Sequence, residues 1–241
     1  HVESFLHGNW QQNDALEFQK KVAQHLKKSA VINDLKRPLY EITKVARYEL
    51  ELACSDNAMV IYYQAQSDDV IEKVKMMALN HLINQDYFNE LRTTQQLGYL
   101  VGAGYAPFNT RAGIAFYIQS PKFEPTTLLH RHNLFISQYL ATINELTEQD
   151  WLQQKHGLTT HIAEKDKNLR LRSQRLWLAI GNGDHRFNMQ QRLLDSLNAL
   201  TLEDLKAYAA EIFNADRPRY ELLSAKSVNL SEKLPLYSHS L

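Results

Sequence analysis

The segment with the clearest chemical potential is residues 91–101, L-R-T-T-Q-Q-L-G-Y-L-V. Arg92 carries a planar guanidinium with several N–H donors, and Tyr99 carries a phenolic hydroxyl. Both groups can bind a peptide carbonyl or an oxyanion, but neither can cleave a bond alone. Residues 89–96 are compatible with a helix, and Gly98 is the expected place to leave it, because glycine takes a positive φ without penalty. Tyr99 then opens a predicted strand.

Other catalytic or metal-binding motifs are not apparent. The sequence His161-Ile162-Ala163-Glu164-Lys165 approaches the zinc motif H-x-x-E-H, but Lys165 replaces the second histidine, and an ammonium would repel the metal. His130 and His132 are two residues apart, so on a helix they diverge by about 200°. No serine elbow or glycine-rich phosphate loop is present. We therefore predict no catalytic residue and no metal ligand in this chain.

Composition argues against several partners. The 27 basic and 27 acidic residues cancel, so no overall field attracts nucleic acid or an anionic membrane. No apolar run approaches the ~20 residues needed to span a bilayer. The single cysteine, Cys54, excludes an internal disulfide and is interpreted as a small buried side chain. A local run of basic residues is either a helix face exposed to water or a stripe that binds anions. Because no aromatic residues are interleaved with it, we expect no nucleic-acid partner. This run consists of Lys165, Lys167, Arg170, Arg172 and Arg175.

Alternating and apolar runs predict five main strands. Residues 40–53 and 59–64 flank the turn residues Ser55-Asp56-Asn57 and are predicted to form a hairpin. Residues 99–105 and 113–120 are predicted to form a second hairpin, and 219–224 a last strand. Three glycines at 98, 102 and 104 indicate a close backbone approach, either by an extended peptide or by a bulge or tight helix packing.

Helical periodicity and capping signals predict the other elements. Residues 2–6 read as the end of a strand, followed by an amphipathic helix from residue 13, whose apolar residues are Leu16, Val22, Ala23 and Leu26. Further helices are predicted from about 70 to 82, then over 124–146, 147–180, 188–200 and 201–214, with capping boxes at Thr147 and Thr201. The expected fold class is α+β, a two-layer arrangement with an antiparallel or mixed sheet covered by helices on one side.

The pattern L-R-T-x-x-Q-L-G-Y-x-V closely resembles a segment in the C-terminal half of the pitrilysin and insulin-degrading enzyme family, which are inverzincin zinc peptidases. The resemblance extends to His7-Gly8-Asn9, to Ile61-Tyr62-Tyr63-Gln64 and to Phe116-Tyr117-Ile118-Gln119-Ser120. It implies that residues 1–38 are the strand and helix at the end of a third domain plus a linker. Residues 39–225 would form the complete C-terminal domain, and 226–241 a C-terminal tail.

The resemblance also implies a function. The full-length protein would be a zinc metalloendopeptidase, periplasmic like its bacterial relatives, that degrades peptides in a closed chamber. Zinc would be held outside this fragment, by an H-x-x-E-H motif in the N-terminal catalytic half of the same polypeptide. This chain would be inactive alone and would contribute Arg92 and Tyr99 as contacts to the peptide substrate and the transition state.

Two alternatives remain open. The whole chain could be a non-catalytic scaffold or a peptide-binding subunit with the same fold. Arg92 could instead form a structural ion pair with Glu90, and Tyr99 could be a strand aromatic with a satisfied hydroxyl.

Overall fold

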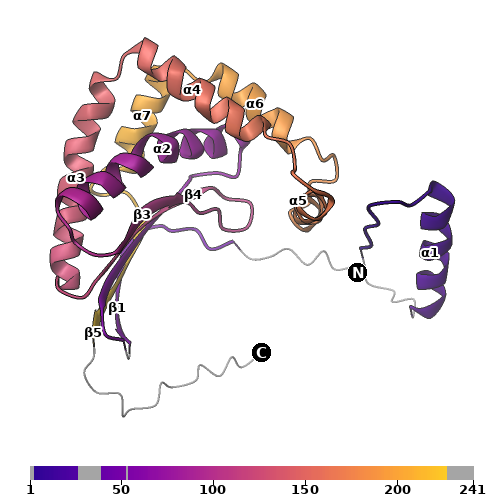
Figure 1. Cartoon of the computed structure of the whole chain (residues 1–241), viewed down its shortest axis with the longest axis horizontal. Coiled ribbons are helices and arrows are strands. Elements are labelled where there is room, and N and C mark those ends of the chain that lie inside the picture. The colour runs from indigo at the N-terminus through magenta and orange to yellow at the C-terminus, as the bar shows by residue number, and fades with distance from the viewer. Residues whose placement is uncertain (1–2, 27–38, 53, 227–241) are drawn as a thin grey trace.

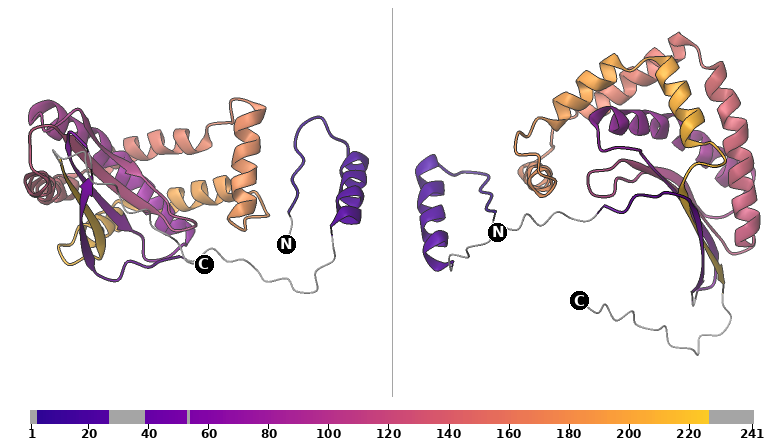
Figure 2. Two further views of the ribbon diagram at one scale, coloured as in Figure 1. Left: turned by 90° about the horizontal axis from the view of Figure 1, so that it is seen from below. Right: turned by 180° about the vertical axis from the view of Figure 1, so that it is seen from behind.

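The computed structural model describes residues 3–26, 39–52 and 54–226. In this part of the chain a five-stranded sheet carries its helices on one face: α2 and α3 pack on the strands, and α4, α6 and α7 pack against these helices (Figures 1 and 2). The predicted two-layer α+β class is therefore confirmed. The strands are β1 (Val45–Leu52), β2 (Asn57–Gln64), β3 (Leu100–Tyr105), β4 (Gly113–Ser120) and β5 (Arg219–Lys226). The α-helices are α1 (Gln12–His25), α2 (Val70–Phe88), α3 (Pro125–Glu145), α4 (Glu148–Ala163), α5 (Leu169–Gly181), α6 (Met189–Ala199) and α7 (Leu202–Ile212).

The sheet is mixed, with the strand order β1-β5-β2-β4-β3. The hairpin predicted for β3 and β4 is confirmed, since the two strands pair antiparallel. The hairpin predicted for β1 and β2 is wrong, because β5 lies between them, parallel to β1 and antiparallel to β2. An ion cluster joins β1 to the inserted strand around the buried carboxylate of Glu221. Arg47 Nε of β1 and Arg219 Nε of β5 each donate to this carboxylate at 2.9 Å.

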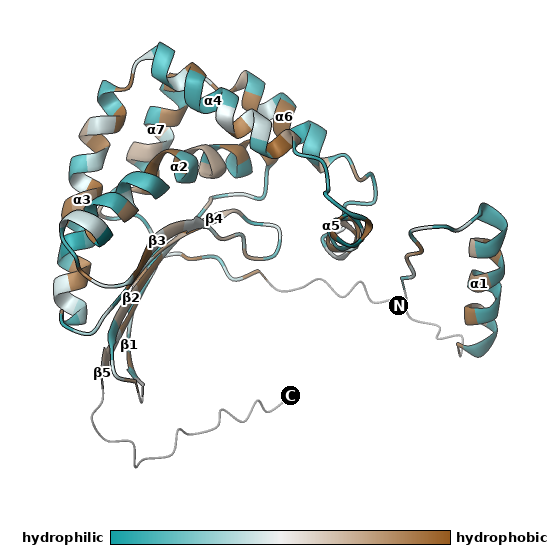
Figure 3. Cartoon of the chain, viewed as in Figure 1, coloured by the Kyte–Doolittle hydropathy of each residue, from teal (hydrophilic) through white to brown (hydrophobic). Residues whose placement is uncertain are grey.

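The core lies between the sheet and the helices, and Figure 3 shows hydrophobic residues along the strands and on the helices that cover them. Ile114, Phe116 and Ile118 of β4 point the same way, as the alternation predicts, and are fully buried. Tyr87 of α2 contacts Phe116, with ring centroids 5.0 Å apart. On the opposite face of β1, Tyr48 and Leu50 are 49% and 41% exposed.

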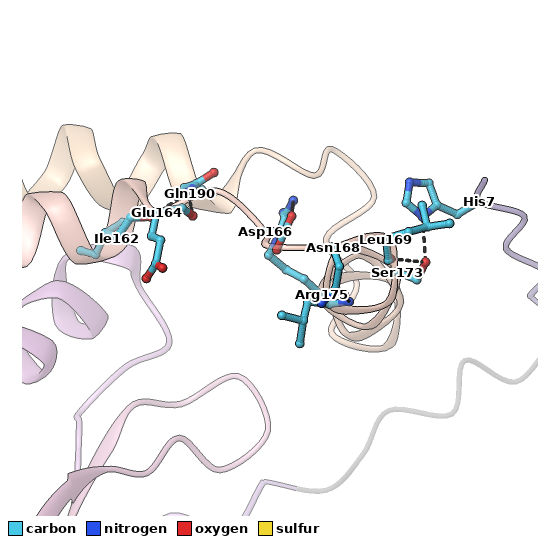
Figure 4. Close-up of polar contacts among 10 residues, drawn as sticks. His7, Ile162, Glu164, Asp166, Asn168, Leu169, Ser173, Arg175 and Gln190 are labelled. Carbon is cyan, nitrogen blue, oxygen red and sulfur yellow. Dashed lines mark hydrogen bonds and ion pairs between the residues drawn. The ribbon is translucent and has the colours of Figure 1, made fainter. Parts of the chain in front are cut away.

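The single helix predicted over 147–180 is wrong. It is two helices, with the chain extended at Glu164 and again at Asn168, where α5 begins. The Asn168 side chain accepts a hydrogen bond from Leu171 N at 2.9 Å, which caps the new helix. Arg175 holds the Asp166 carboxylate through three N–H···O contacts of 2.7 to 3.0 Å (Figure 4). Part of the predicted basic stripe is therefore paired with acid and does not form one continuous helix face.

The N-terminal segment lies beside α5, away from the sheet (Figures 1 and 2). The strand predicted at 2–6 is not observed in its described part, residues 3–6. A strand needs a neighbouring strand to bond with, and none in the described chain pairs with this segment. His7 Nδ1 lies 2.8 Å from Ser173 Oγ of α5 (Figure 4). Helix α1 forms as predicted but buries none of its side chains. The predicted linker at 31–38 lies outside the described residues. Of the tail predicted at 226–241, Lys226 is instead the last residue of β5, and residues 227–241 lie outside the described residues.

Candidate functional site

The segment that holds Arg92 and Tyr99 begins as a continuation of α2. A π-helix, η1 (Asn89–Thr94), extends α2 and is anchored by buried Leu91. Gln96 then takes a left-handed conformation with φ 51° and turns the chain toward β3. The prediction that Gly98 supplies the positive φ is therefore wrong. Buried Leu97, whose N–H donates to Leu91 O at 3.0 Å, closes the turn. Short π-helical segments of this kind occur frequently at functional sites.

Gly98 has a different role, which is close backbone packing. A Cβ on this residue would lie 1.9 Å from Gln119 O of β4. At Gly102 a Cβ would lie 2.4 Å from the Tyr117 hydroxyl. Gly98 is therefore needed because the β4 backbone itself approaches closely, which is neither the peptide nor the bulge that the sequence suggested, whereas at Gly102 the close neighbour is a side chain. At Gly104 nothing lies within 4 Å of the added atom.

Replacing Gly98 with alanine is expected to destabilise the fold by about 1–3 kcal/mol or more, because a backbone atom of β4 would have to move. The matched substitution Gly104→Ala adds the same methyl group into open space and should change the free energy of unfolding by less than about 1 kcal/mol. Urea unfolding followed by circular dichroism compares the two variants. Equal midpoints would contradict the close packing of Gly98 against Gln119.

Arg92 and Tyr99, both predicted as site residues, lie together at the start of β3. Arg92 Nε donates to the backbone oxygen of Tyr99 at 3.2 Å. Among the described residues, the terminal amino groups of Arg92 have no hydrogen-bond partner. The ion pair considered with Glu90 does not form, since Glu90 Oε1 accepts from Gln95 Nε2 at 2.9 Å. Tyr99 is 60% exposed and Arg92 is half-buried, so Tyr99 is the more accessible of the two at the surface.

The Tyr99 hydroxyl belongs to a small polar network that sequence reasoning missed. It donates to Asp56 Oδ2 at 3.1 Å, and Gln119 Nε2 donates to both groups at 3.0 Å. The hydrogen bond to Asp56 raises the pKa of Tyr99 above its usual value. Asp56 is only 8% exposed and lies in the turn before β2, whereas Gln119 lies on β4. In the sequence, Ser55-Asp56-Asn57 indicated only a turn. Gln119 was noted only as part of a segment that resembles the family.

Cys54 lies next to this network. It is half-buried, and its Sγ donates to the backbone oxygen of Asp56 at 3.1 Å. The interpretation as a simple buried hydrophobe is therefore incomplete, because the thiol also supports the turn.

The described residues do not fit a zinc site. They contain no cluster of three or more histidine, cysteine, aspartate or glutamate side chains able to hold a metal ion. Helix α4 ends at Ala163, so the stretch from His161 to Lys165 crosses the end of the helix. His132 is fully buried, with its Nδ1 3.1 Å from Tyr87 Oη, and burial lowers its pKa to about 3. None of the helices in the described ranges is long and apolar enough to cross a lipid bilayer.

Comparison with known proteins shows relatives for most of the chain. Residues 78–177 match a family model described as PQQ synthase PqqF-like, C-terminal lobe domain 4. The human insulin-degrading enzyme is 27% identical over 237 residues, which cover 93% of this chain and 23% of that enzyme. The predicted relationship to the pitrilysin and insulin-degrading enzyme family is confirmed. The chain thus spans about a quarter of the length of its relatives in this family.

The fold is shared with solved structures. Pitrilysin superposes with a TM-score of 0.80 at 19% identity, covering 94% of this chain and 24% of that chain. The peptidase M16 inactive domain from Pseudomonas fluorescens superposes with a TM-score of 0.64 at 18% identity, covering 92% of this chain and 52% of that one. Proteins with this fold therefore include pitrilysin and a domain described as inactive.

Proposed function

We propose that this chain is the non-catalytic C-terminal region of a zinc-dependent endopeptidase of the pitrilysin and insulin-degrading enzyme family. It contributes contacts to the substrate and the transition state in a closed chamber and provides no zinc ligand. Residues 1–38 belong to the preceding domain and its linker, 39–225 form the C-terminal domain, and 226–241 form a tail. Its partners are peptide substrates and the N-terminal catalytic half of the same polypeptide.

The observation that carries this proposal is the placement of Arg92. Its Nε is fixed by the Tyr99 carbonyl, so the direction of the guanidinium plane is set. In the described part of the chain its two terminal amino groups remain available as donors. Fixed donors directed at developing negative charge stabilise a transition state more than donors that must reorient. A peptide carbonyl polarised by a metal bound elsewhere in the polypeptide is a suitable ligand for this group.

The complete polypeptide is expected to cleave a fluorogenic peptide, and removing the metal with 1,10-phenanthroline should abolish cleavage because the zinc-bound water is lost. Added zinc should restore activity. The 241-residue chain alone should show no cleavage at the same concentration. Cleavage that persists after complete metal removal, or cleavage by the isolated chain, would contradict the proposal.

One observation favours a second candidate, a non-catalytic scaffold or peptide-binding subunit. The Pseudomonas fluorescens neighbour with the same fold is described as an inactive domain. The coding sequence upstream distinguishes the candidates, because the endopeptidase requires H-x-x-E-H there and the scaffold does not. If the motif is absent and the complete polypeptide binds peptides without cleaving them, the scaffold is the correct assignment.

For the cellular location, we propose the periplasm. The support is the resemblance to bacterial pitrilysin. Fractionation of cells that produce the complete polypeptide tests this, and recovery with cytosolic markers would contradict it.

A further inference from the structure

A cavity of about 380 Å³ lies where α4, α5 and α6 meet α2. Its apolar lining comes from these four helices and the loop before α6, and includes Met77, Ile162, Leu178, Ala179, Phe187 and Leu193. Met77 precedes Arg92 by 15 residues along α2 and η1, which is roughly 20 Å at about 1.5 Å per residue. A concave and mainly apolar space of this size is typical of a site for a small organic ligand. The cavity is therefore a candidate second site, separate from Arg92 and Tyr99.

Two large apolar side chains that line the cavity are left exposed. Leu178 is 65% exposed and Phe187 is 41% exposed. Phe187 also has φ 55°, a left-handed conformation that a bulky residue rarely adopts and that is found preferentially at ligand-binding and active sites. Apolar surface in contact with water is unfavourable, so a ligand that covers both side chains gains binding free energy.

The main polar feature of the cavity is the carboxylate of Asp184, in the loop between α5 and α6. Gly183, with φ 75°, follows the end of α5 and donates its N–H to Ile180 O at 2.9 Å. Asp184 N donates to Ala179 O at 2.8 Å, which fixes its backbone beside the cavity. Asp184 Oδ2 is shielded from solvent and has no hydrogen-bond partner among the described residues. A buried carboxylate oxygen without a donor is unfavourable, so this oxygen favours a ligand that supplies one.

The charges around the cavity determine the sign of the ligand. The titratable side chains that line it are His161, Glu164, Arg175 and Asp184. Arg175 is turned to Asp166 (Figure 4), so its positive charge is already balanced. Glu164 lies 3.2 Å from Lys167, but both side chains are more than half exposed and such a pair is weak. With histidine counted as neutral at pH 7, the unbalanced charge at the cavity is negative and favours a cation.

We infer that this cavity binds a small organic cation, whose apolar body covers Leu178 and Phe187 and whose protonated amine donates to Asp184 Oδ2. The ammonium provides the donor that this oxygen lacks, and a hydrogen bond between charged groups is stronger than one between neutral groups. The apolar body removes exposed hydrocarbon from water. The proposed function is not required for this binding, since Arg92 and Tyr99 lie elsewhere.

The four methionines allow binding to be measured in the 241-residue chain, by NMR of carbon-labelled methionine methyl groups. Met77 and Met189 line the cavity, whereas Met59 and Met76 are fully buried in the core. Titration with 2-phenylethylammonium should shift the Met77 and Met189 signals and leave the other two in place. If neither Met77 nor Met189 shifts up to the solubility limit of the amine, the inference is overturned.

Neutral and anionic probes of similar shape test the charge preference. The alcohol 2-phenylethanol, which carries a hydroxyl in place of the ammonium, should bind about tenfold more weakly than the amine, because the charged hydrogen bond is lost. An adjoining groove is lined by Lys73, Arg186 and Arg192, so phenylacetate shows whether these cations control binding instead. Equal affinity for amine and alcohol, or tighter binding of phenylacetate, would overturn the inference.

Two variants connect the preference to the cavity. Asp184→Asn keeps the size of the side chain but loses its charge, so amine affinity should fall about tenfold while alcohol affinity is unchanged. Asp195→Asn, the matched change on α6 at a residue that does not line the cavity, should alter neither. Ala179→Leu fills the cavity, should block both probes, and is the second variant if Asp184→Asn fails to fold. Unchanged Met59 and Met76 signals show that the fold is kept. Wild-type amine affinity in either folded cavity variant would overturn the inference.

Discussion

Replacing Arg92 with alanine in the complete polypeptide is expected to lower kcat for peptide cleavage about a hundredfold or more. Removal of one preorganised donor to an oxyanion costs about 3–4 kcal/mol in comparable sites. The effect should appear in kcat more than in KM, because the donor acts mainly on charge that develops in the transition state. Initial rates over a range of peptide concentrations give both constants.

Two controls accompany this variant. Arg92→Lys keeps the positive charge but loses the planar fork, so it should recover only part of the activity. Arg170→Ala, which removes a similar charge from the first turn of α5, should leave kcat unchanged. Arg92→Ala should also unfold near the wild-type temperature, since the described structure gives its side chain one hydrogen bond. Wild-type turnover in a folded Arg92→Ala enzyme would refute the assigned role.

The largest expected effect on stability is at Glu221. Its carboxylate is 1% exposed and lies 2.8 Å from both Arg47 and Arg219 guanidinium groups. Glu221→Ala would leave the Arg219 side chain, which is only 12% exposed, without its carboxylate and with only the Ala215 and Arg217 backbone oxygens as acceptors. Breaking a buried ion pair in this way costs about 3–5 kcal/mol. Urea unfolding of the 241-residue chain should therefore show a markedly lower midpoint.

Arg47→Ala is the matched control on the other side of the same cluster. The Arg47 side chain is 50% exposed and Glu221 keeps Arg219 as a partner, so the loss should be about 1 kcal/mol or less. If the two substitutions lower the free energy of unfolding equally, burial does not control this cluster and the interpretation is wrong.

Local signals predicted much of the fold. The capping boxes at Thr147 and Thr201 mark helix starts that the structure reproduces, with each threonine accepting from the amide three residues later. The β3 and β4 hairpin and the α3 helix were also predicted close to their observed bounds. In these places the determinants lie within a few residues of one another.

The wrong predictions concern places where the structure depends on contacts between residues far apart in the sequence. Nothing near residues 45–64 indicates that β5, more than 150 residues later, separates β1 from β2. The break after α4 depends on the Asn168 cap and the Asp166 pair with Arg175, which periodicity does not detect. At the site, the motif predicted Arg92 and Tyr99 together. Asp56 was missed because only the folded sheet brings a turn residue beside Tyr99.

The position of β5 between β1 and β2 has a consequence for how the protein forms in the cell. A ribosome must release residues up to about 226 before β1 can bond to the rest of the sheet, because its partner β5 is the last strand of the described chain. Until then β2 has an unpaired edge, which is a hazard for association with other chains. Closure of the sheet therefore requires contacts between residues far apart in sequence, which is intrinsically slow. Nascent chains that stall inside α7 should need chaperone protection.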